Sequence, residues 1–284
     1  MTYLQSLPNF YQRLIISFII LVLLTAILIL SQTPPFGWLF VGALTFLQAR
    51  ALYEYYYLAQ LKGFYPSIKL AITTSAFLLV SRFVAIENPS FAYLPAVLIY
   101  VSISACALSH MYKAIESIPN LAITLFGLLY ITLSLSWILE LNFRGGLFWV
   151  VYAIAVTKAS DTAAYIVGKT CGQHPLSPFL SPKKTIEGAV GGLLGSCLMS
   201  VLLILFFPGH SYCPLPSVFE GAILGLIMGT AATFGDLVES LLKRDAKVKD
   251  SGSLPGLGGA LDMVDSLIFT IPLLYIYLRA RAFL

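Results

Sequence analysis

The sequence contains few charged residues for its length. Asp, Glu, Lys and Arg make up only 11% of its 284 residues, whereas soluble domains carry roughly 25%. Hydrophobic residues make up 58%, and the mean hydropathy is +0.88. This composition argues against a soluble fold and indicates an integral membrane protein.

Dense basic tracts and paired cysteines are also absent. The net charge of +4 comes from 17 Lys and Arg against 13 Asp and Glu, without a basic run that would suit nucleic acid. The four cysteines are Cys106, Cys171, Cys197 and Cys213, and no two of them form a CxxC pair. We therefore predict no nucleic-acid partner, and the sequence signals neither a zinc site nor a redox motif.

Apolar runs long enough to cross a bilayer recur along the chain. A helix needs about 20 residues to span a hydrocarbon core of about 30 Å. The segments that qualify are 14–31, 36–58, 70–86, 91–108, 121–141, 146–167, 189–207, 218–238 and 261–278. We expect an all-α, polytopic fold of about nine transmembrane helices. The first run follows Arg13 and could instead be a signal peptide, although it is longer than the usual apolar region of one.

No polar interval is large enough to separate a second globular domain. We therefore expect one membrane domain over 1–284, with hydrophobic helices in 1–145 and the catalytic helices and cytoplasmic loops in 146–284. Nine spans would place the chain ends on opposite faces, and the basic residues then divide unequally. The N-terminal face has Arg13, Lys62, Lys69, Lys113, Lys169, Lys183, Lys184, Lys243, Arg244, Lys247 and Lys249, and the other face has Arg82, Arg144, Arg279 and Arg281. By the positive-inside rule the N-terminal face is cytoplasmic, so the long polar loops 168–188 and 241–260 face the cytoplasm from the cell (inner) membrane.

Several carboxylates fall at or within the predicted spans. A charge at membrane depth is costly, and it usually persists because it is paired, binds a metal or faces a wet cavity. Residues three or four apart share a helix face. Two such stripes lead toward the basic loops: Asp161, Tyr165 and Lys169, and Asp236, Ser240 and Lys243.

Asp262 and Asp265 are spaced to share one face where the last helix begins. Carboxylate oxygens suit a hard cation such as Mg²⁺, which also takes phosphate oxygens and water. We therefore predict Asp236, Asp262 and Asp265 as ligands of Mg²⁺, with room for a second cation. In the structural alternative, Lys158 pairs with Asp161, and Asp262 and Asp265 cap a helix N-terminus.

Two polar loops have features that suit phosphate groups. The loop SPKKTIEG (181–188) places two lysines before a helix start, an arrangement that favours phosphate but also occurs in ordinary loops near a membrane. The loop DSGSLPGLGG (250–259) has four glycines that could bring its backbone close to a ligand. It is not a Walker A sequence, and it could equally be a flexible turn.

Residues 240–265, SLLKRDAKVKDSGSLPGLGGALDMVD, resemble the signature of the phosphatidate cytidylyltransferases, in which SxxKR is followed by KD, PGHGG and DRxD. The matching residues are Ser240, Lys243, Arg244, Lys249, Asp250, Pro255, Gly256, Gly258, Gly259, Asp262 and Asp265, with Gly235 and Asp236 upstream. A second block, 160–188, is similar to the family at Asp161, Tyr165, Gly168, Lys169, Ser181, Pro182, Lys184, Thr185 and Gly188. The two blocks cover roughly 160 to 266, and we expect the first half to match only in being hydrophobic and multi-spanning.

The chain departs from the family pattern at three points. Leu257 replaces the family's His, Met263 replaces the Arg between the last two aspartates, and the glycine loop is one residue shorter. Nucleotidyl transfer depends chiefly on positioning and charge neutralisation, so these losses need not abolish activity.

The resemblance implies an enzyme of phospholipid biosynthesis that transfers CMP from CTP to phosphatidic acid, giving CDP-diacylglycerol and pyrophosphate. It implies catalytic roles for Asp236, Asp262, Asp265, Lys243 and Arg244. It implies substrate-binding roles for Asp161, Lys169, Lys184, Thr185, Ser240, Lys249, Asp250, Gly258 and Gly259. A CTP-dependent lipid kinase and an ion-coupled transporter are the alternatives, and the oligomeric state, a homodimer included, stays open.

Overall fold

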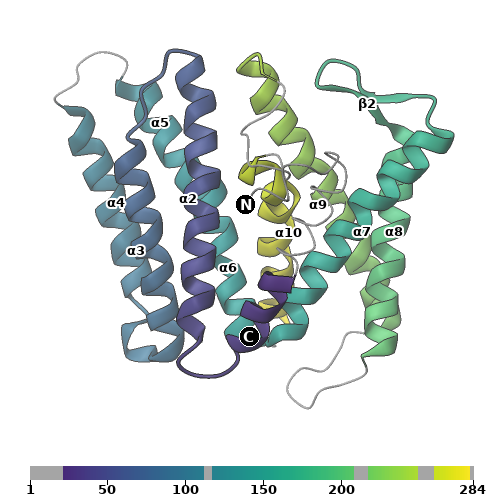
Figure 1. The fold of residues 1–284 in the computed structure, drawn as a ribbon, viewed down its shortest axis with the longest axis horizontal. Helices are drawn as coiled ribbons and strands as arrows, with labels where there is room; N and C mark the ends of the chain where they lie inside the picture. The colour runs from purple at the N-terminus through teal and green to yellow at the C-terminus, as the bar shows by residue number, and fades with distance from the viewer. Residues whose placement is uncertain (1–21, 112–116, 208–216, 249–258, 282–284) are drawn as a thin grey trace, which may run out of the picture. The chain divides into compact units, whose positions relative to one another are not determined.

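The computed structural model describes residues 22–111, 117–207, 217–248 and 259–281, and almost all of them are helical (Figure 1). Within these residues, seven helices are long and apolar enough to cross a membrane. They are Ile68–Glu87, Pro89–Ser109, Ser117–Gly145, Leu147–Cys171, Ile186–Phe206, Val218–Asp245 and Ala260–Ala280. The all-α polytopic fold is thereby confirmed.

The expected number of nine spans is not confirmed. The predicted span 14–31 begins outside the described residues, although residues 22–30 are helical. The predicted span 36–58 forms helix α2 (Gly37–Leu61), which is not among the seven. Arg50, Glu54 and a run of tyrosines lower the hydropathy of α2.

The described helices fall into two compact units. The first comprises the chain up to Thr132 together with 246–263. It contains α2, α3 (Ile68–Glu87), the 3₁₀ turn Pro89–Phe91, α4 (Leu94–Met111), α5 (Ser117–Gly127) and most of a π-helical turn, Leu128–Leu133. In this unit α3 packs between α2 and α4, and α5 contacts all three (Figure 1).

Buried polar side chains of the first unit bond to one another. Gln48 donates to the Thr132 carbonyl oxygen at 3.3 Å, and the Ser75 hydroxyl donates to Gln48 Oε1 at 3.0 Å. The Tyr56 hydroxyl donates to the Thr124 carbonyl oxygen at 2.8 Å. Because no water is available inside an apolar helix bundle, such internal partners are what allow polar groups to be buried there.

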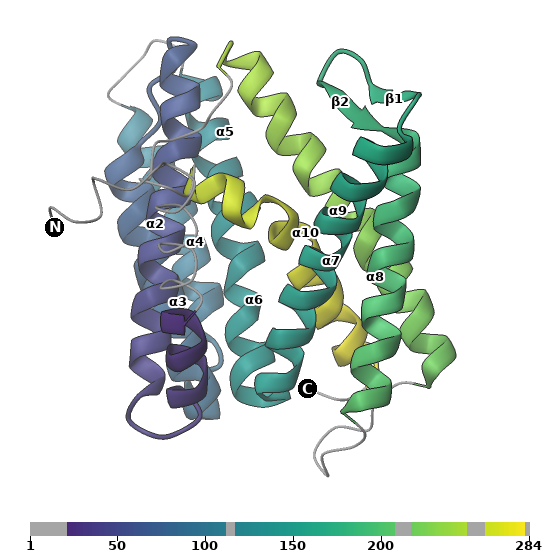
Figure 2. The ribbon, with the colours of Figure 1, turned by 45° about the vertical axis from the view of Figure 1, so that its right-hand side comes forward.

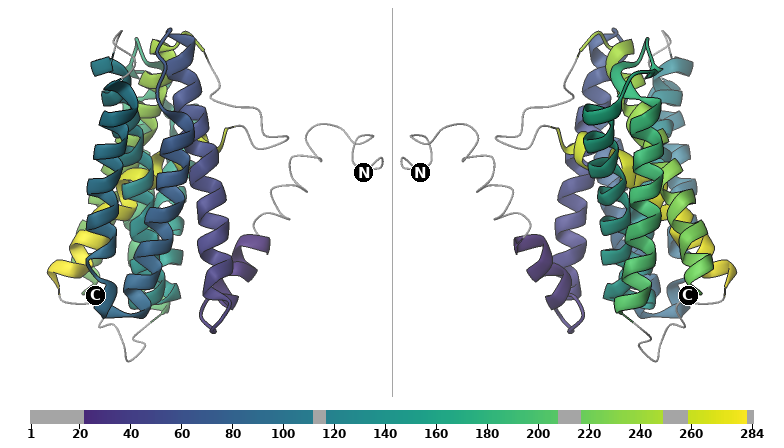
Figure 3. Two further views of the ribbon diagram at one scale, coloured as in Figure 1. Left: turned by 90° about the vertical axis from the view of Figure 1, so that its left-hand side faces the viewer. Right: turned by 90° about the vertical axis from the view of Figure 1, so that its right-hand side faces the viewer.

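The second unit comprises Leu133–Asp245 and the chain from Val264 onward. It contains α6 (Ser134–Glu140), the π-helical turn Leu141–Gly145, α7 (Leu147–Cys171), α8 (Ile186–Phe206), α9 (Val218–Asp245) and most of α10 (Ala260–Ala280). Strands β1 (Pro175–Ser177) and β2 (Ser181–Thr185) form an antiparallel hairpin that pairs Pro175 with Thr185. The hairpin lies beyond the ends of α7 and α8 (Figures 2 and 3).

Small residues bring α7 and α8 close together. A Cβ added at Gly188 would lie 2.9 Å from the Ala164 carbonyl oxygen, and one at Gly192 would lie 3.1 Å from the Ser160 carbonyl oxygen. Glycines at such positions let membrane helices pack with their backbones close together. The start of α8 is thereby held against the stretch of α7 that contains Asp161.

The polar loops are shorter than expected, because α7 runs on to Cys171 and α9 to Asp245. Hydropathy marks only the apolar part of a helix that continues beyond the hydrocarbon core.

The first compact unit ends at Thr132 and also includes 246–263. The predicted single membrane domain, with its hydrophobic helices in 1–145 and its catalytic part in 146–284, stays a prediction.

Candidate active site

A pocket of about 630 Å³ lies in the second unit. It is lined from α7, the hairpin, the start of α8 and α9. Its lining residues are Ser160, Asp161, Ala164, Tyr165, Gly168, Lys169, Leu176, Ser181, Lys183, Lys184, Thr185, Gly188, Ala189, Thr233 and Asp236. The predicted site residues Asp161, Lys169, Lys184, Thr185 and Asp236 therefore share one pocket.

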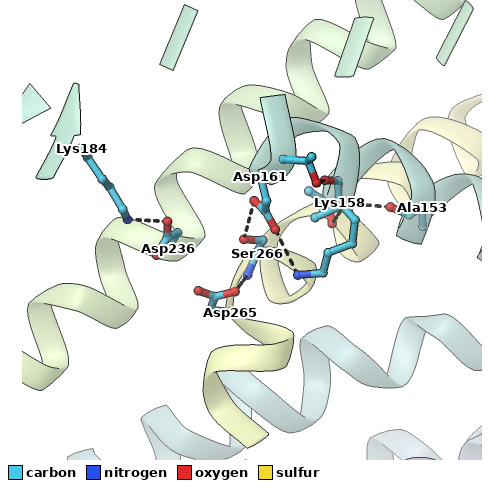
Figure 4. Close-up of polar contacts among 10 residues, drawn as sticks. Ala153, Lys158, Asp161, Lys184, Asp236, Asp265 and Ser266 are labelled. Carbon is cyan, nitrogen blue, oxygen red and sulfur yellow. Dashed lines mark hydrogen bonds and ion pairs between the residues drawn. The ribbon is translucent and has the colours of Figure 1, made fainter. Parts of the chain in front are cut away.

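An ion pair joins the hairpin to α9 beside this pocket. Lys184 Nζ lies 2.5 Å from Asp236 Oδ2 (Figure 4). The next residue, Thr185, caps α8 by accepting a hydrogen bond from the Gly188 N–H at 3.1 Å. The loop that we expected at 181–188 is thus a strand that leads directly into a capped helix N-terminus, where backbone N–H groups favour anions.

Asp161 contacts two side chains in the same region. Lys158 Nζ lies 3.0 Å from Asp161 Oδ2, and the Ser266 hydroxyl lies 3.4 Å from Asp161 Oδ1 (Figure 4). The structural alternative, in which Lys158 pairs with Asp161, is therefore observed. Since Asp161 also lines the pocket, the pairing is compatible with a role in binding.

Three carboxylates converge at the crossing of α9 and α10. Asp236, Glu239 and Asp265 each have an oxygen within 4.8 Å of the other two, and Glu239 and Asp265 are buried. Three acidic side chains at this spacing, all with oxygen donors, fit a hard divalent cation. Ser266 N–H donates to Asp265 Oδ1 at 2.5 Å, which fixes one oxygen of that carboxylate.

Gly235 allows α9 and α10 to meet at this cluster. A Cβ at Gly235 would lie 2.5 Å from the Asp265 carbonyl oxygen and 2.9 Å from Ser266 Cα. Any side chain there would separate the two backbones. The glycine next to Asp236 therefore sets the distance between the carboxylates of the two helices.

The basic residues of α9 have partners outside the pocket. Lys243 Nζ lies 2.5 Å from Glu239 Oε1, so the lysine that we placed on a stripe with Asp236 is paired one turn away. Arg244 Nε donates to the Leu180 carbonyl oxygen at 3.1 Å and so connects the end of α9 to the hairpin. Their predicted contacts with phosphate stay predictions.

The remaining predicted residues are placed as follows. Lys169 Nζ lies 5.7 Å from the centre of the Tyr165 ring, and Ser240 is half-buried in α9. Asp262, in the first unit, accepts a hydrogen bond from the Gly259 N–H at 3.4 Å, as the capping alternative expected. Its role as a metal ligand stays a prediction. Lys249, Asp250, Leu257 and Gly258 lie outside the described residues.

Several residues of this region were not among the predicted site residues. Lys183 and Thr233 line the pocket, and Glu239 belongs to the carboxylate cluster. Glu239 could have been found, since it follows Asp236 by three residues and so shares its helix face.

Comparison with known proteins gives the family. The model of the cytidylyltransferase family matches residues 11–281. The chain belongs to this family. The phosphatidate cytidylyltransferase of Chlamydia pneumoniae is 31% identical over 289 residues, which is 95% of this chain and 92% of that protein. The phosphatidate cytidylyltransferase of Synechocystis is 35% identical over 297 residues, which is 94% of this chain and 95% of that protein.

The likeness extends well beyond the two sequence blocks. The alignments cover about 95% of the chain and so include its first half, and our expectation that this half resembles the family only in hydrophobicity stays a prediction. The phosphatidate cytidylyltransferase of Bacillus subtilis, by contrast, is 41% identical over 134 residues, 47% of this chain and 48% of that protein. Membership of the family makes the protein a nucleotidyltransferase of the membrane.

Proposed function

We propose that this protein is a phosphatidate cytidylyltransferase, which transfers CMP from CTP to phosphatidic acid and releases pyrophosphate. The observation that carries the proposal is the ion pair between Lys184 and Asp236. It joins a pocket lined by three lysines to a cluster of three carboxylates. Both substrates carry phosphate groups. Transfer of CMP between them needs cationic side chains that bind the phosphate oxygens and a site that neutralises their negative charge.

The lysines of the pocket are suited to bind the phosphates. Lys169 from α7 and Lys183 and Lys184 from β2 line it, and the capped N-terminus of α8 begins directly after Lys184 and Thr185. Lysine binds phosphate as a point charge, and a helix N-terminus adds hydrogen bonds and a favourable dipole. In this proposal Lys184 exchanges part of its contact with Asp236 for a phosphate oxygen.

The carboxylate cluster is suited to hold Mg²⁺. Asp236, Glu239 and Asp265 would hold it, and we add Asp262 from the sequence pattern; a second cation is part of the proposal. When bound, the cation neutralises charge on the phosphate oxygens. Lys184 contacts a substrate phosphate beside the cluster, and Asp161, which lines the pocket and pairs with Lys158, takes part in substrate binding.

No protein nucleophile is needed in this reaction. An oxygen of the phosphatidic acid phosphate forms a bond to the α-phosphorus of CTP, and the bond between that phosphorus and the bridging oxygen to the β-phosphate breaks. Pyrophosphate leaves with the electron pair. The attacking phosphate is already an anion at neutral pH, so we assign no general base, and the residues of the pocket act by position and charge.

The setting in the membrane follows from the same proposal. We propose that the pocket and the hairpin face the cytoplasm from the inner membrane, where CTP is available, while phosphatidic acid comes from the bilayer. The excess of basic residues on the N-terminal face supports this orientation. A homodimer is a further proposal that the sequence permits.

The test uses purified protein in detergent with CTP, Mg²⁺ and either phosphatidic acid or diacylglycerol. We expect CDP-diacylglycerol from phosphatidic acid and no lipid product from diacylglycerol. Formation of phosphatidic acid from diacylglycerol would establish the CTP-dependent lipid kinase instead. No product with either lipid would contradict both.

A further inference from the structure

A buried carboxylate in α2 lies outside both sequence blocks. Glu54 is only 2% exposed, and its Oε1 lies 3.5 Å from Arg50 Nη2. Its other oxygen, Oε2, accepts a hydrogen bond from the backbone N–H of Leu261 at 2.8 Å. Glu54, Arg50 and Leu261 all belong to the first compact unit.

The hydrogen bond from the Leu261 N–H to Glu54 matters because this N–H lies in the first turn of α10. Leu261 is the second residue of α10, and the first N–H groups of a helix have no partner within it. Leu261 is fully buried, so water does not reach its N–H. A carboxylate at this position satisfies the donor and also interacts favourably with the positive end of the helix dipole. Glu54 therefore caps α10 from another helix.

The turn that Glu54 holds contains Asp262. Within the same turn, Asp262 Oδ2 accepts the Gly259 N–H at 3.4 Å, which is a long hydrogen bond. The shorter and fully buried contact is the one from Glu54. Glu54 therefore holds the backbone of the turn from which Asp262 projects.

We infer that Glu54 is a positioning residue for Asp262, and this inference rests on the proposed function. By holding the first turn of α10, Glu54 keeps the Asp262 carboxylate in the place where it assists the reaction. It touches no substrate in this account. Its loss should change the geometry of the site more than the binding of lipid.

The activity test compares Glu54→Ala with Glu54→Gln. The glutamine keeps an oxygen that can accept a hydrogen bond from the Leu261 N–H. Glu54→Gln should therefore keep most of the activity that Glu54→Ala loses. Loss of a helix cap shifts the folding equilibrium of the helix end roughly two- to thirtyfold. We expect Glu54→Ala to lower kcat, and to raise the half-saturating Mg²⁺ concentration, by a factor in that range. The KM for phosphatidic acid should stay near the wild-type value.

Gln48→Ala is the matched control, because Gln48 is a buried polar residue of the same helix that bonds to Ser75 and Thr132 instead of α10. It should lower Tm without changing the Mg²⁺ dependence. Equal losses in Glu54→Ala and Glu54→Gln, or the same Mg²⁺ shift in Gln48→Ala, would overturn the inference.

Hydrogen–deuterium exchange separates this inference from the proposed function. In Glu54→Ala, the amides of 259–264 should exchange roughly two- to thirtyfold faster than in wild type, and in Glu54→Gln they should stay protected. If the wild-type protein makes no CDP-lipid, the proposed function fails, and the exchange data alone decide whether Glu54 holds this turn. Unchanged exchange in Glu54→Ala would overturn the inference whatever the activity.

Discussion

Lys184 at the end of β2 and Asp236 in the middle of α9 form an ion pair of 2.5 Å. The two residues come from the two separate sequence blocks, and their contact brings these blocks into one site. Both side chains are partly exposed, with relative exposures of 25% for Lys184 and 40% for Asp236, although the Lys184 Nζ atom itself is buried against its partner. The pair connects the basic pocket with the acidic cluster.

Replacement of Lys184 by alanine should weaken substrate use more than it harms folding. A hydrogen bond to a charged group contributes about 1.5–3 kcal/mol, so we expect kcat/KM for CTP to fall roughly tenfold or more, with little change in Tm. Lys62→Ala, at an exposed position just after α2, is the control for an exposed lysine outside the pocket. Equal kinetic constants in the two variants would favour an ordinary cytoplasmic loop over a phosphate site.

Neutral replacement of the carboxylates should remove activity from a folded protein. We expect Asp236→Asn and Asp262→Asn each to abolish CDP-lipid formation while the protein stays in the membrane, because each removes a proposed cation ligand. Asp265→Asn should have a smaller effect, since one of its oxygens is already held by the Ser266 N–H. Near-normal turnover of Asp236→Asn at unchanged Mg²⁺ dependence would contradict the metal assignment.

Glu239 needs a separate design, because it is buried and pairs with the half-buried Lys243. Glu239→Gln alone would break this pair, which costs up to about 3–5 kcal/mol when a pair is buried. The double variant Glu239→Gln with Lys243→Met removes both charges and should recover most of the stability. Because Lys243 is itself a proposed phosphate contact, the double variant is compared with Lys243→Met alone in the CDP-lipid assay. We expect the double variant to lose more activity than Lys243→Met. Equal activity in the two variants would make Glu239 purely structural.

Two alanine substitutions at glycines test the close approach of α9 and α10. Gly235→Ala should lower activity strongly and lower Tm, because the new Cβ would lie 2.5 Å from the Asp265 carbonyl oxygen. Gly42→Ala, in α2, has no atom within 4 Å of the new Cβ. It should be neutral or stabilising by up to about 1 kcal/mol, as expected of alanine in a helix. Similar Tm values for both variants would show that the backbones do not need this contact.

Much of the pocket could be predicted from the sequence. Asp161 and Asp236 stand out because charged residues at membrane depth need a partner or a function. Lys184 stands out because it lies in a basic loop just before a helix start. The hairpin was not predicted, because SPKKT has no alternation of apolar and polar residues that would indicate a strand.

Other parts depend on tertiary packing. The contact between Glu54 and Leu261 joins residues 207 positions apart. Nothing in the local pattern of α2 shows that its glutamate reaches α10. The pairing of Lys243 with Glu239, by contrast, could have been predicted, because Glu239 is the only carboxylate three or four residues from this lysine.

Leu257 allows a test of the histidine that the family has at this position. Because the attacking phosphate needs no proton removed and metal-bound pyrophosphate leaves readily, we expect the wild-type protein to be active. Leu257→His should therefore change turnover little. A general acid or base contributes at least about two orders of magnitude, so a gain of that size in kcat would show that the histidine is an obligatory acid or base.

The position of the transferred phosphorus decides the reaction most directly. Purified protein with Mg²⁺ and either phosphatidic acid or diacylglycerol is given CTP labelled at the α-phosphorus or at the γ-phosphorus, and the lipid and aqueous products are separated. Our account predicts that the α label enters the lipid as CDP-diacylglycerol and that the γ label appears in pyrophosphate. Transfer of the γ label to lipid, with CDP as the aqueous product, would contradict it.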